Sequence, residues 1–91
     1  MKRIYIFTCP KCKGCNNLKR ILVNQSIPFI DVNTSAPENK KLWDDIKYQT
    51  NSEAIPMVFI QNNDEFEGQA YIPDKDWKTI DDIVEIIKNN I

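Results

Sequence analysis

The most informative segment of this chain is Phe7-Thr8-Cys9-Pro10-Lys11-Cys12-Lys13-Gly14-Cys15. It holds all three cysteines of the chain, arranged as two overlapping C-x-x-C pairs. Cysteines this close together cannot join distant segments, and in a reducing compartment such clusters usually serve redox chemistry or bind metal. The stretch therefore predicts a thiol-based or metal-binding site.

An apolar strand precedes the cysteines, and an amphipathic helix follows them. Residues 4–7 form a continuous apolar run that is typical of a buried strand. After the cysteines, Leu18, Ile21 and Leu22 recur at helical spacing, and the next strand is predicted over residues 28–32. A strand, a helix and a strand of these lengths predict a right-handed parallel crossover.

The second half of the chain predicts a further helix, a hairpin and a closing helix. A Ser-x-x-Glu capping box over residues 35–38 predicts the start of the middle helix. Residues 56–60 and 65–69 have the composition of two strands joined by a turn. A second capping box, formed by Thr79 and Asp82, predicts the last helix.

The predicted order of elements is β-α-β-α-β-β-α, which gives the fold class α/β with a four-stranded mixed sheet flanked by three helices, of the thioredoxin type. With 91 residues, 42% of them apolar, the chain suits a single domain of residues 1–91. Twelve basic and thirteen acidic residues give a net charge of -1, which argues against a nucleic-acid partner. The apolar run near the start is too short for a signal peptide or a membrane span, so we predict a cytoplasmic protein without a membrane partner.

The spacing of the cysteines fits two working pairs, Cys9 with Cys12 or Cys12 with Cys15. A helix that began at Cys9 would leave no residues for the turn after the strand, and it would place Gly14 inside the helix at a cost of about 1 kcal/mol. Pro10 favours that earlier start, because proline suits the first helical position after a Cys9 cap. We expect the helix to begin at Cys12.

This cysteine-containing run resembles the opening motif of the glutaredoxin family, F-T-x-P-x-C-x-x-C, and the match continues without a gap through Lys19, Ile21, Leu22 and Phe29. Residues 53–60 resemble the family's T-V-P-x-h-F-I stretch, where h is any apolar residue and the proline is cis. The resemblance covers residues 2–60 well. It implies a glutaredoxin-like thiol-disulfide oxidoreductase of the thioredoxin-fold superfamily, which we expect to be a monomer.

The resemblance places Cys12 at the family's nucleophile, with Cys15 as the resolving thiol and as its partner in a redox disulfide. At a helix N-terminus, backbone N–H groups and the helix dipole lower the pKa of a cysteine from ~8.5 towards ~3.5 to 7.5, which favours the reactive thiolate. Lys11 and Lys13 flank Cys12 and favour the anion further. Cys9 has no assigned duty in the family pattern, and we predict an accessory thiol there.

The predicted substrate- or glutathione-binding residues are Lys11, Lys13, Gly14, Ile55, Pro56 and Gly68. In the family, the backbone of the residue before the cis proline pairs with the substrate, which assigns that contact to Ile55. A trans proline at the start of a strand is the alternative, because only about 5 to 6% of X-Pro bonds are cis. Gly68 matches one glycine of the family's Gly-Gly-x-Asp segment, which binds the glutathione carboxylate, but it fits a plain strand-end glycine equally well.

The predicted function is the reduction of protein or glutathione-mixed disulfides by a dithiol mechanism, with no bound cofactor and no metal. The implied partners are a disulfide-containing protein substrate and an electron source, which is either glutathione or thioredoxin reductase. Glutathione is thus implied as a reductant or as a substrate. The alternative is an iron-sulfur or metal-binding protein that uses Cys9, Cys12 and Cys15. Such sites normally take four ligands, and the chain has neither a histidine nor a fourth cysteine.

Overall fold

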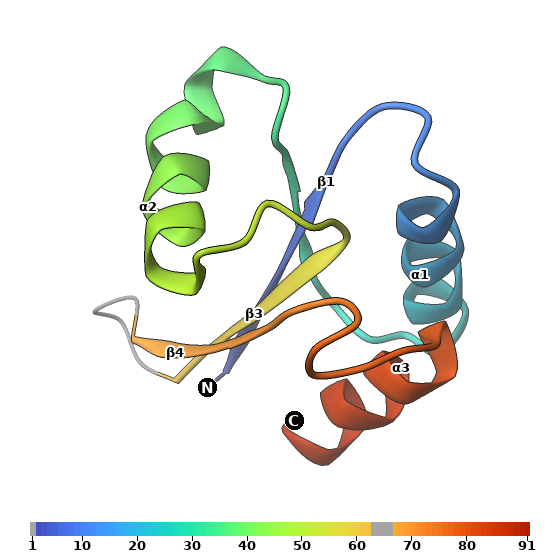
Figure 1. Ribbon diagram of the computed structural model, residues 1–91. Coiled ribbons are helices and arrows are strands. Elements are labelled where there is room, and N and C mark those ends of the chain that lie inside the picture. Colours follow the sequence, from blue (N-terminus) through green and yellow to red (C-terminus); the bar gives the residue numbers. More distant parts are fainter. Residues whose placement is uncertain (1, 63–66) are drawn as a thin grey trace.

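The computed structural model describes residues 2–62 and 67–91, and it contains one mixed sheet with helices on both faces (Figure 1). The elements in chain order are β1 (Arg3–Thr8), α1 (Lys13–Asn24), β2 (Ile30–Asn33), a short 3-10 turn η1 (Pro37–Asn39), α2 (Lys40–Thr50), β3 (Met57–Gln61), β4 (Gly68–Tyr71) and α3 (Ile80–Asn89). This is the predicted order, and the predicted α/β thioredoxin fold is confirmed.

The four strands lie in the order β2-β1-β3-β4. β1 and β2 are parallel, with Thr8 beside Asn33, as expected when a helix connects them. β3 is antiparallel to β1, and the pairing of Phe7 with Met57 brings the end of β1 beside the start of β3. β4 continues the sheet as an antiparallel hairpin partner of β3. The C-terminal end of β1 therefore lies centrally, next to the loop that enters α1.

The alternation of side chains along β1 separates two apolar clusters, one on each face of the sheet. Ile4 and Ile6 face α1 and α3 and belong to the larger cluster, whereas Phe7 faces α2. On the α2 face, the ring of Phe7 stacks on that of Trp43 with centroids 5.3 Å apart. Figure 1 shows the same division, with α2 on one side of the sheet and α1 and α3 together on the other. The helix carrying the cysteines is thus packed firmly along its length.

One of the two predicted capping boxes is present. Thr79 caps α3 and receives the N–H of Asp82, whose side chain accepts the N–H of Thr79 in return. The box predicted at Ser35 is wrong, because the N–H of Ser35 donates to Asn33 Oδ1 at 2.9 Å and the chain forms η1 before α2 begins. The side chain of Asn33 thus holds Ser35 in a turn, which moves the helix start to Lys40.

The second hairpin strand lies later in the chain than predicted. Of the predicted residues 65–69, residues 65 and 66 lie outside the described residues, and β4 covers Gly68–Tyr71. Pairing of Tyr71 with Val58 extends the strand, and it ends where the N–H of Ile72 donates to Asp76 Oδ2 at 2.8 Å. Among the helices of the described residues, none is long and apolar enough to span a bilayer.

Candidate active site

Cys12 caps the N-terminus of α1. Its backbone is extended, its sulfur accepts the N–H of Cys15 at 3.1 Å, and its carbonyl accepts the N–H of Asn16 at 3.1 Å. The helix therefore begins after Cys12, as predicted, and Cys9 and Pro10 lie in the loop that connects it to β1. The Cys12 sulfur lies where the unpaired N–H groups of the first turn converge, which is the position that favours negative charge.

Cys12 and Cys15 form a disulfide, with their Cα atoms 5.2 Å apart. Cys12 is half-buried, whereas Cys15 is fully buried beneath the first turn of the helix. Cys12 is therefore the more accessible residue of the pair, and Cys15 is the shielded one. Such an asymmetric pair suits a reaction in which the more accessible cysteine meets the substrate first and the buried one acts second.

Pro56 lies directly beside this disulfide-bearing turn. The Ile55–Pro56 peptide bond is cis, as predicted, and Pro56 is buried. A Cβ atom added at Gly14 would come 3.6 Å from Pro56 Cδ, so the two residues are in close proximity. Because Phe7 pairs with Met57, Pro56 lies just beyond the end of that pairing, at the level of Thr8. The start of β3 thus forms one wall of the site.

Two exposed lysines flank Cys12 in the chain. Lys11 adopts a left-handed conformation with a φ of 65°, which turns the chain sharply just before the helix cap. Lys13 is the first residue of α1. Of the predicted binding residues, Lys11, Lys13, Gly14, Ile55 and Pro56 are therefore brought together around Cys12.

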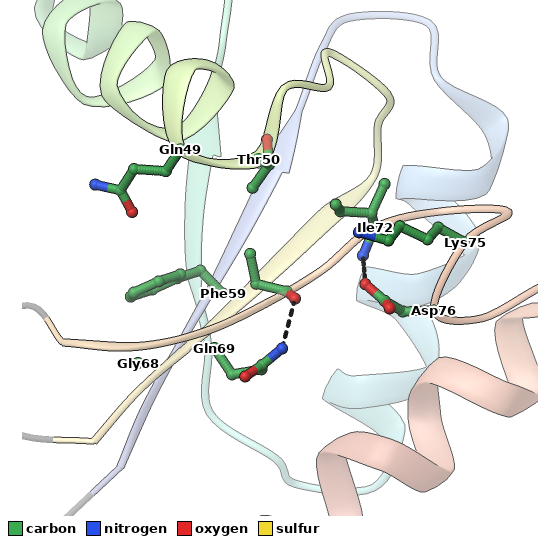
Figure 2. Close-up of a pocket in the computed structure, with 9 residues that line it drawn as sticks. Gln49, Thr50, Phe59, Gly68, Gln69, Ile72, Lys75 and Asp76 are labelled. Atoms are coloured by element: carbon green, nitrogen blue, oxygen red, sulfur yellow. Dashed lines mark hydrogen bonds between the residues drawn. The ribbon is translucent and has the colours of Figure 1, made fainter.

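Gly68 does not lie with them, and its predicted place in the site is not supported. It pairs with Gln61 at the far end of β3, four residues along the strand from Met57, or roughly 13 Å away. A Cβ atom there would overlap the Ile60 carbonyl group, so glycine is required by the close approach of β4 to β3. Gly68 borders a pocket of about 280 Å³ between β4 and the last turn of α2, as Figure 2 shows, and no cysteine lines that pocket.

A polar cluster beside the site was not predicted from the sequence. Thr8, at the end of β1, donates its hydroxyl to Asp31 Oδ1 at 2.7 Å, and Lys19 of α1 binds Asp31 Oδ2 at 2.9 Å. Burial raises the pKa of Asp31, but the hydrogen bond from Thr8 and the charge of Lys19 outweigh that effect and hold the pKa below its ordinary value. The sequence feature that could have indicated this cluster is Lys19, a basic residue one turn after Cys15 on the same side of the helix.

Cys9 is a half-buried free thiol in the loop before Cys12. The alternative prediction, a metal or iron-sulfur site built from Cys9, Cys12 and Cys15, finds no support in the geometry. Among residues 2–62 and 67–91, no group of three or more potential metal ligands is placed to hold an ion. In this state of the protein, two of the three sulfurs are joined to each other.

A thioredoxin-type sheet with a C-x-x-C disulfide at a helix N-terminus and a cis proline beside it defines a thiol-disulfide oxidoreductase class of protein. A sequence model of the glutaredoxin family matches residues 4–66, more than half of the chain. The chain belongs to the glutaredoxin family. A comparison with individual curated proteins found no match. The family works with glutathione and protein disulfides, and its kind of chemistry is thiol-disulfide exchange.

Proposed function

We propose that the protein reduces protein disulfides or glutathione-mixed disulfides by a dithiol mechanism. Cys12 is the nucleophile, and Cys15 is the resolving thiol. The observation that carries the proposal is the Cys12–Cys15 disulfide at the start of α1, with Cys12 the more accessible residue and Cys15 buried, in a chain of the glutaredoxin family.

In the first step, the thiolate of Cys12 attacks one sulfur of the substrate disulfide. A bond forms between Cys12 and that sulfur, the substrate S–S bond breaks, and the other substrate sulfur leaves as a thiolate that takes a proton from water. The N–H of Cys15, 3.1 Å from the Cys12 sulfur, supports this role because it stabilises negative charge there.

In the second step, Cys15 loses its proton to water and its sulfur attacks Cys12. The bond between Cys12 and the substrate breaks, the Cys12–Cys15 disulfide forms, and the substrate sulfur leaves and takes up a proton. The protein dithiol has then given two electrons and two protons to the substrate. The 5.2 Å separation of the two Cα atoms supports ready closure of this bond.

Substrate contacts are assigned to the residues around Cys12. The exposed ammonium groups of Lys11 and Lys13 complement carboxylates of glutathione or of an acidic substrate segment. The backbone of Ile55, before the cis Pro56, is assigned to pairing with an extended substrate chain. Gly14 keeps the first helical turn free of a side chain on the side facing Pro56.

Glutathione is the proposed reductant, and the chemistry requires no bound cofactor. Two glutathione molecules reduce the Cys12–Cys15 disulfide back to the dithiol and are themselves joined as oxidised glutathione. Thioredoxin reductase is the other proposed electron source, because either donor delivers the same two electrons to the same disulfide.

The test compares the wild-type protein with Cys12→Ser on insulin and on a mixed disulfide of glutathione and cysteine. Each reaction is supplied either with glutathione and its reductase or with thioredoxin reductase, and NADPH consumption is followed. We expect wild-type turnover with at least one donor and none with Cys12→Ser. Equal turnover by the two proteins, or none by the wild type with either donor, would contradict the proposal.

A further inference from the structure

The cluster of Thr8, Lys19 and Asp31 joins three elements next to the disulfide. Thr8 ends β1, Asp31 lies on the neighbouring β2, and Lys19 lies on α1, so the two contacts of Asp31 connect both strands to the helix. The Thr8 carbonyl is held in turn by the N–H of Thr34 at 2.7 Å and by its hydroxyl at 2.8 Å. The end of β1 is therefore fixed just before the chain enters the cysteine loop.

The side chains of this cluster point to the face of the sheet that α1 covers. Asp31 pairs with Ile6, whose side chain belongs to the cluster packed under α1, and Thr8 follows Ile6 by two residues. Thr8 is only 3% exposed, whereas the side chains of Lys19 and Asp31 are 27% and 42% exposed, so the ion pair lies beside the helix and is partly open to solvent. Because solvent partly screens a pair of this exposure, its role here is to fix the helix against β2 rather than to add a large stabilisation.

Lys19 lies four residues after Cys15, which places the two side chains one helical turn apart on the same side of α1. Cys15 is fully buried on that side, so it also faces the sheet. The ion pair therefore anchors the turn next to Cys15, while Cys12 at the helix cap lies beyond this anchor. A loss of the anchor would affect the position of Cys15 before that of Cys12.

We propose that Asp31 is a positioning residue for the resolving step, acting through Thr8 and Lys19 to hold Cys15 in line with the sulfur of Cys12. The inference rests on the proposed dithiol function and adds a residue to it. Resolution is an intramolecular attack by one sulfur on another, and the rate of such a step depends steeply on the alignment of the two atoms. The first attack, by Cys12 on an incoming disulfide, does not require Cys15 to be aligned.

The experiment separates the two steps in a single turnover. Reduced Cys9→Ser protein is mixed with dithionitrobenzoate: attack by Cys12 releases one thionitrobenzoate, and attack by Cys15 on the resulting mixed disulfide releases the second. The two releases are followed by stopped-flow absorbance. The Cys9→Ser background leaves two thiols in the chain, so the two phases are assigned without ambiguity.

In this background, Asp31→Asn is expected to slow the second release roughly tenfold and to leave the first unchanged. Lys19→Met is expected to do the same, and Lys19→Arg, which restores the positive charge, to recover most of the rate. The matched control is Asp44→Asn, which removes the ion pairs of Asp44 with Lys40, at 2.7 Å, and with Lys47, at 3.4 Å, on α2 and is expected to change neither phase.

A second release that keeps its rate in Asp31→Asn and in Lys19→Met would overturn the inference, as would equal slowing of both phases. Thermal unfolding of each variant is recorded to detect general destabilisation. If the variants slow the second release only because the fold is loosened, Lys19→Arg is not expected to restore its rate. Absence of the second release in the parent protein would overturn the dithiol function itself and the inference with it. A second release that is present in the parent and insensitive to Asp31 would overturn the inference alone.

Discussion

The sulfur of Cys12 accepts a hydrogen bond from the backbone N–H of Cys15 at 3.1 Å. Like the Cys12–Cys15 disulfide, this contact joins the two ends of the C-x-x-C motif, and it depends on α1 beginning directly after Cys12. A helix that began earlier would direct these N–H groups at Cys9 instead. The start of α1 therefore gives the three cysteines different surroundings: Cys12 caps the helix, Cys15 is buried, and Cys9 lies in the loop.

The reduced protein is expected to be alkylated first at Cys12. Iodoacetamide reacts with thiolates, and the N-terminal N–H groups of α1 favour the thiolate at Cys12, so it is expected to react roughly tenfold faster than Cys9 near neutral pH. Cys15 is buried and is expected to react last. Peptide mass spectrometry after short exposures gives the order. A faster reaction at Cys9 than at Cys12 would be inconsistent with the assigned roles.

Replacement of Ser26 by glycine is expected to stabilise the fold. The N–H of Ile27 donates to the Leu22 carbonyl and that of Ser26 to the Val23 carbonyl, which is a Schellman motif with Ser26 at the left-handed position, φ 57°. Glycine adopts this conformation without the steric cost, which is about 1 kcal/mol for other residues. Urea unfolding should show a higher midpoint for Ser26→Gly. Ser26→Ala is the control, since it keeps the Cβ, and an equal gain there would refute this explanation.

Replacement of Gly68 by alanine is expected to destabilise the fold without affecting catalysis. The added Cβ would collide with the Ile60 carbonyl, and relieving such overpacking typically costs roughly 1 to 3 kcal/mol. The unfolding midpoint should fall, while the glutathione dependence of activity, measured at a temperature where the variant is folded, should match the wild type. A raised KM for glutathione in the folded variant would instead indicate that Gly68 takes part in glutathione binding.

The contribution of Asp31 to stability is expected to depend on pH. Folding lowers the pKa of Asp31 from its ordinary value of 3.8, so the ionised group stabilises the folded state above that value, and the stabilisation is lost as the pH falls through the lowered pKa. The difference in free energy of unfolding between wild type and Asp31→Asn should therefore be present at neutral pH and vanish at acidic pH. Urea unfolding midpoints at several pH values measure this difference.

The matched control for this pH dependence is Asp44→Asn. Lys40 hydrogen-bonds Asp44 and lowers its pKa, but the Lys40 side chain is 77% exposed, against 27% for Lys19, so solvent screens this pair more and a smaller stability difference is expected. A stability difference for Asp31→Asn that is unchanged from neutral to acid pH would show that its effect does not come from the ionised carboxylate.

The sequence predicted the features that depend on local pattern. The start of α1 at Cys12 followed from the length of the βα loop and from Gly14, and the capping box of Thr79 followed from residue types at fixed spacing. The same reasoning was wrong at Ser35, because a competing side chain, that of Asn33, accepts its N–H. Local motifs are thus reliable only where no neighbouring polar group offers an alternative partner.

Features that depend on strand register could not be predicted from the sequence. Gly68 looked like a binding glycine, but its pairing with Gln61 places it at the opposite end of β3 from Pro56. Asp31 and Lys19 are twelve residues apart on different elements, and only the parallel pairing of β1 with β2 brings Asp31 to Thr8 and under α1. Their role beside Cys15 is a property of the assembled sheet.

The roles of the three cysteines are tested by disulfide reduction with Cys9→Ser, Cys12→Ser and Cys15→Ser side by side with the wild type, using insulin and the productive electron donor. We expect Cys12→Ser to be inactive, Cys9→Ser to keep wild-type activity, and Cys15→Ser to lose insulin reduction because the mixed disulfide is not resolved. An inactive Cys9→Ser together with an active Cys15→Ser would contradict the roles assigned to Cys12 and Cys15 and would assign the reaction to Cys9 and Cys12.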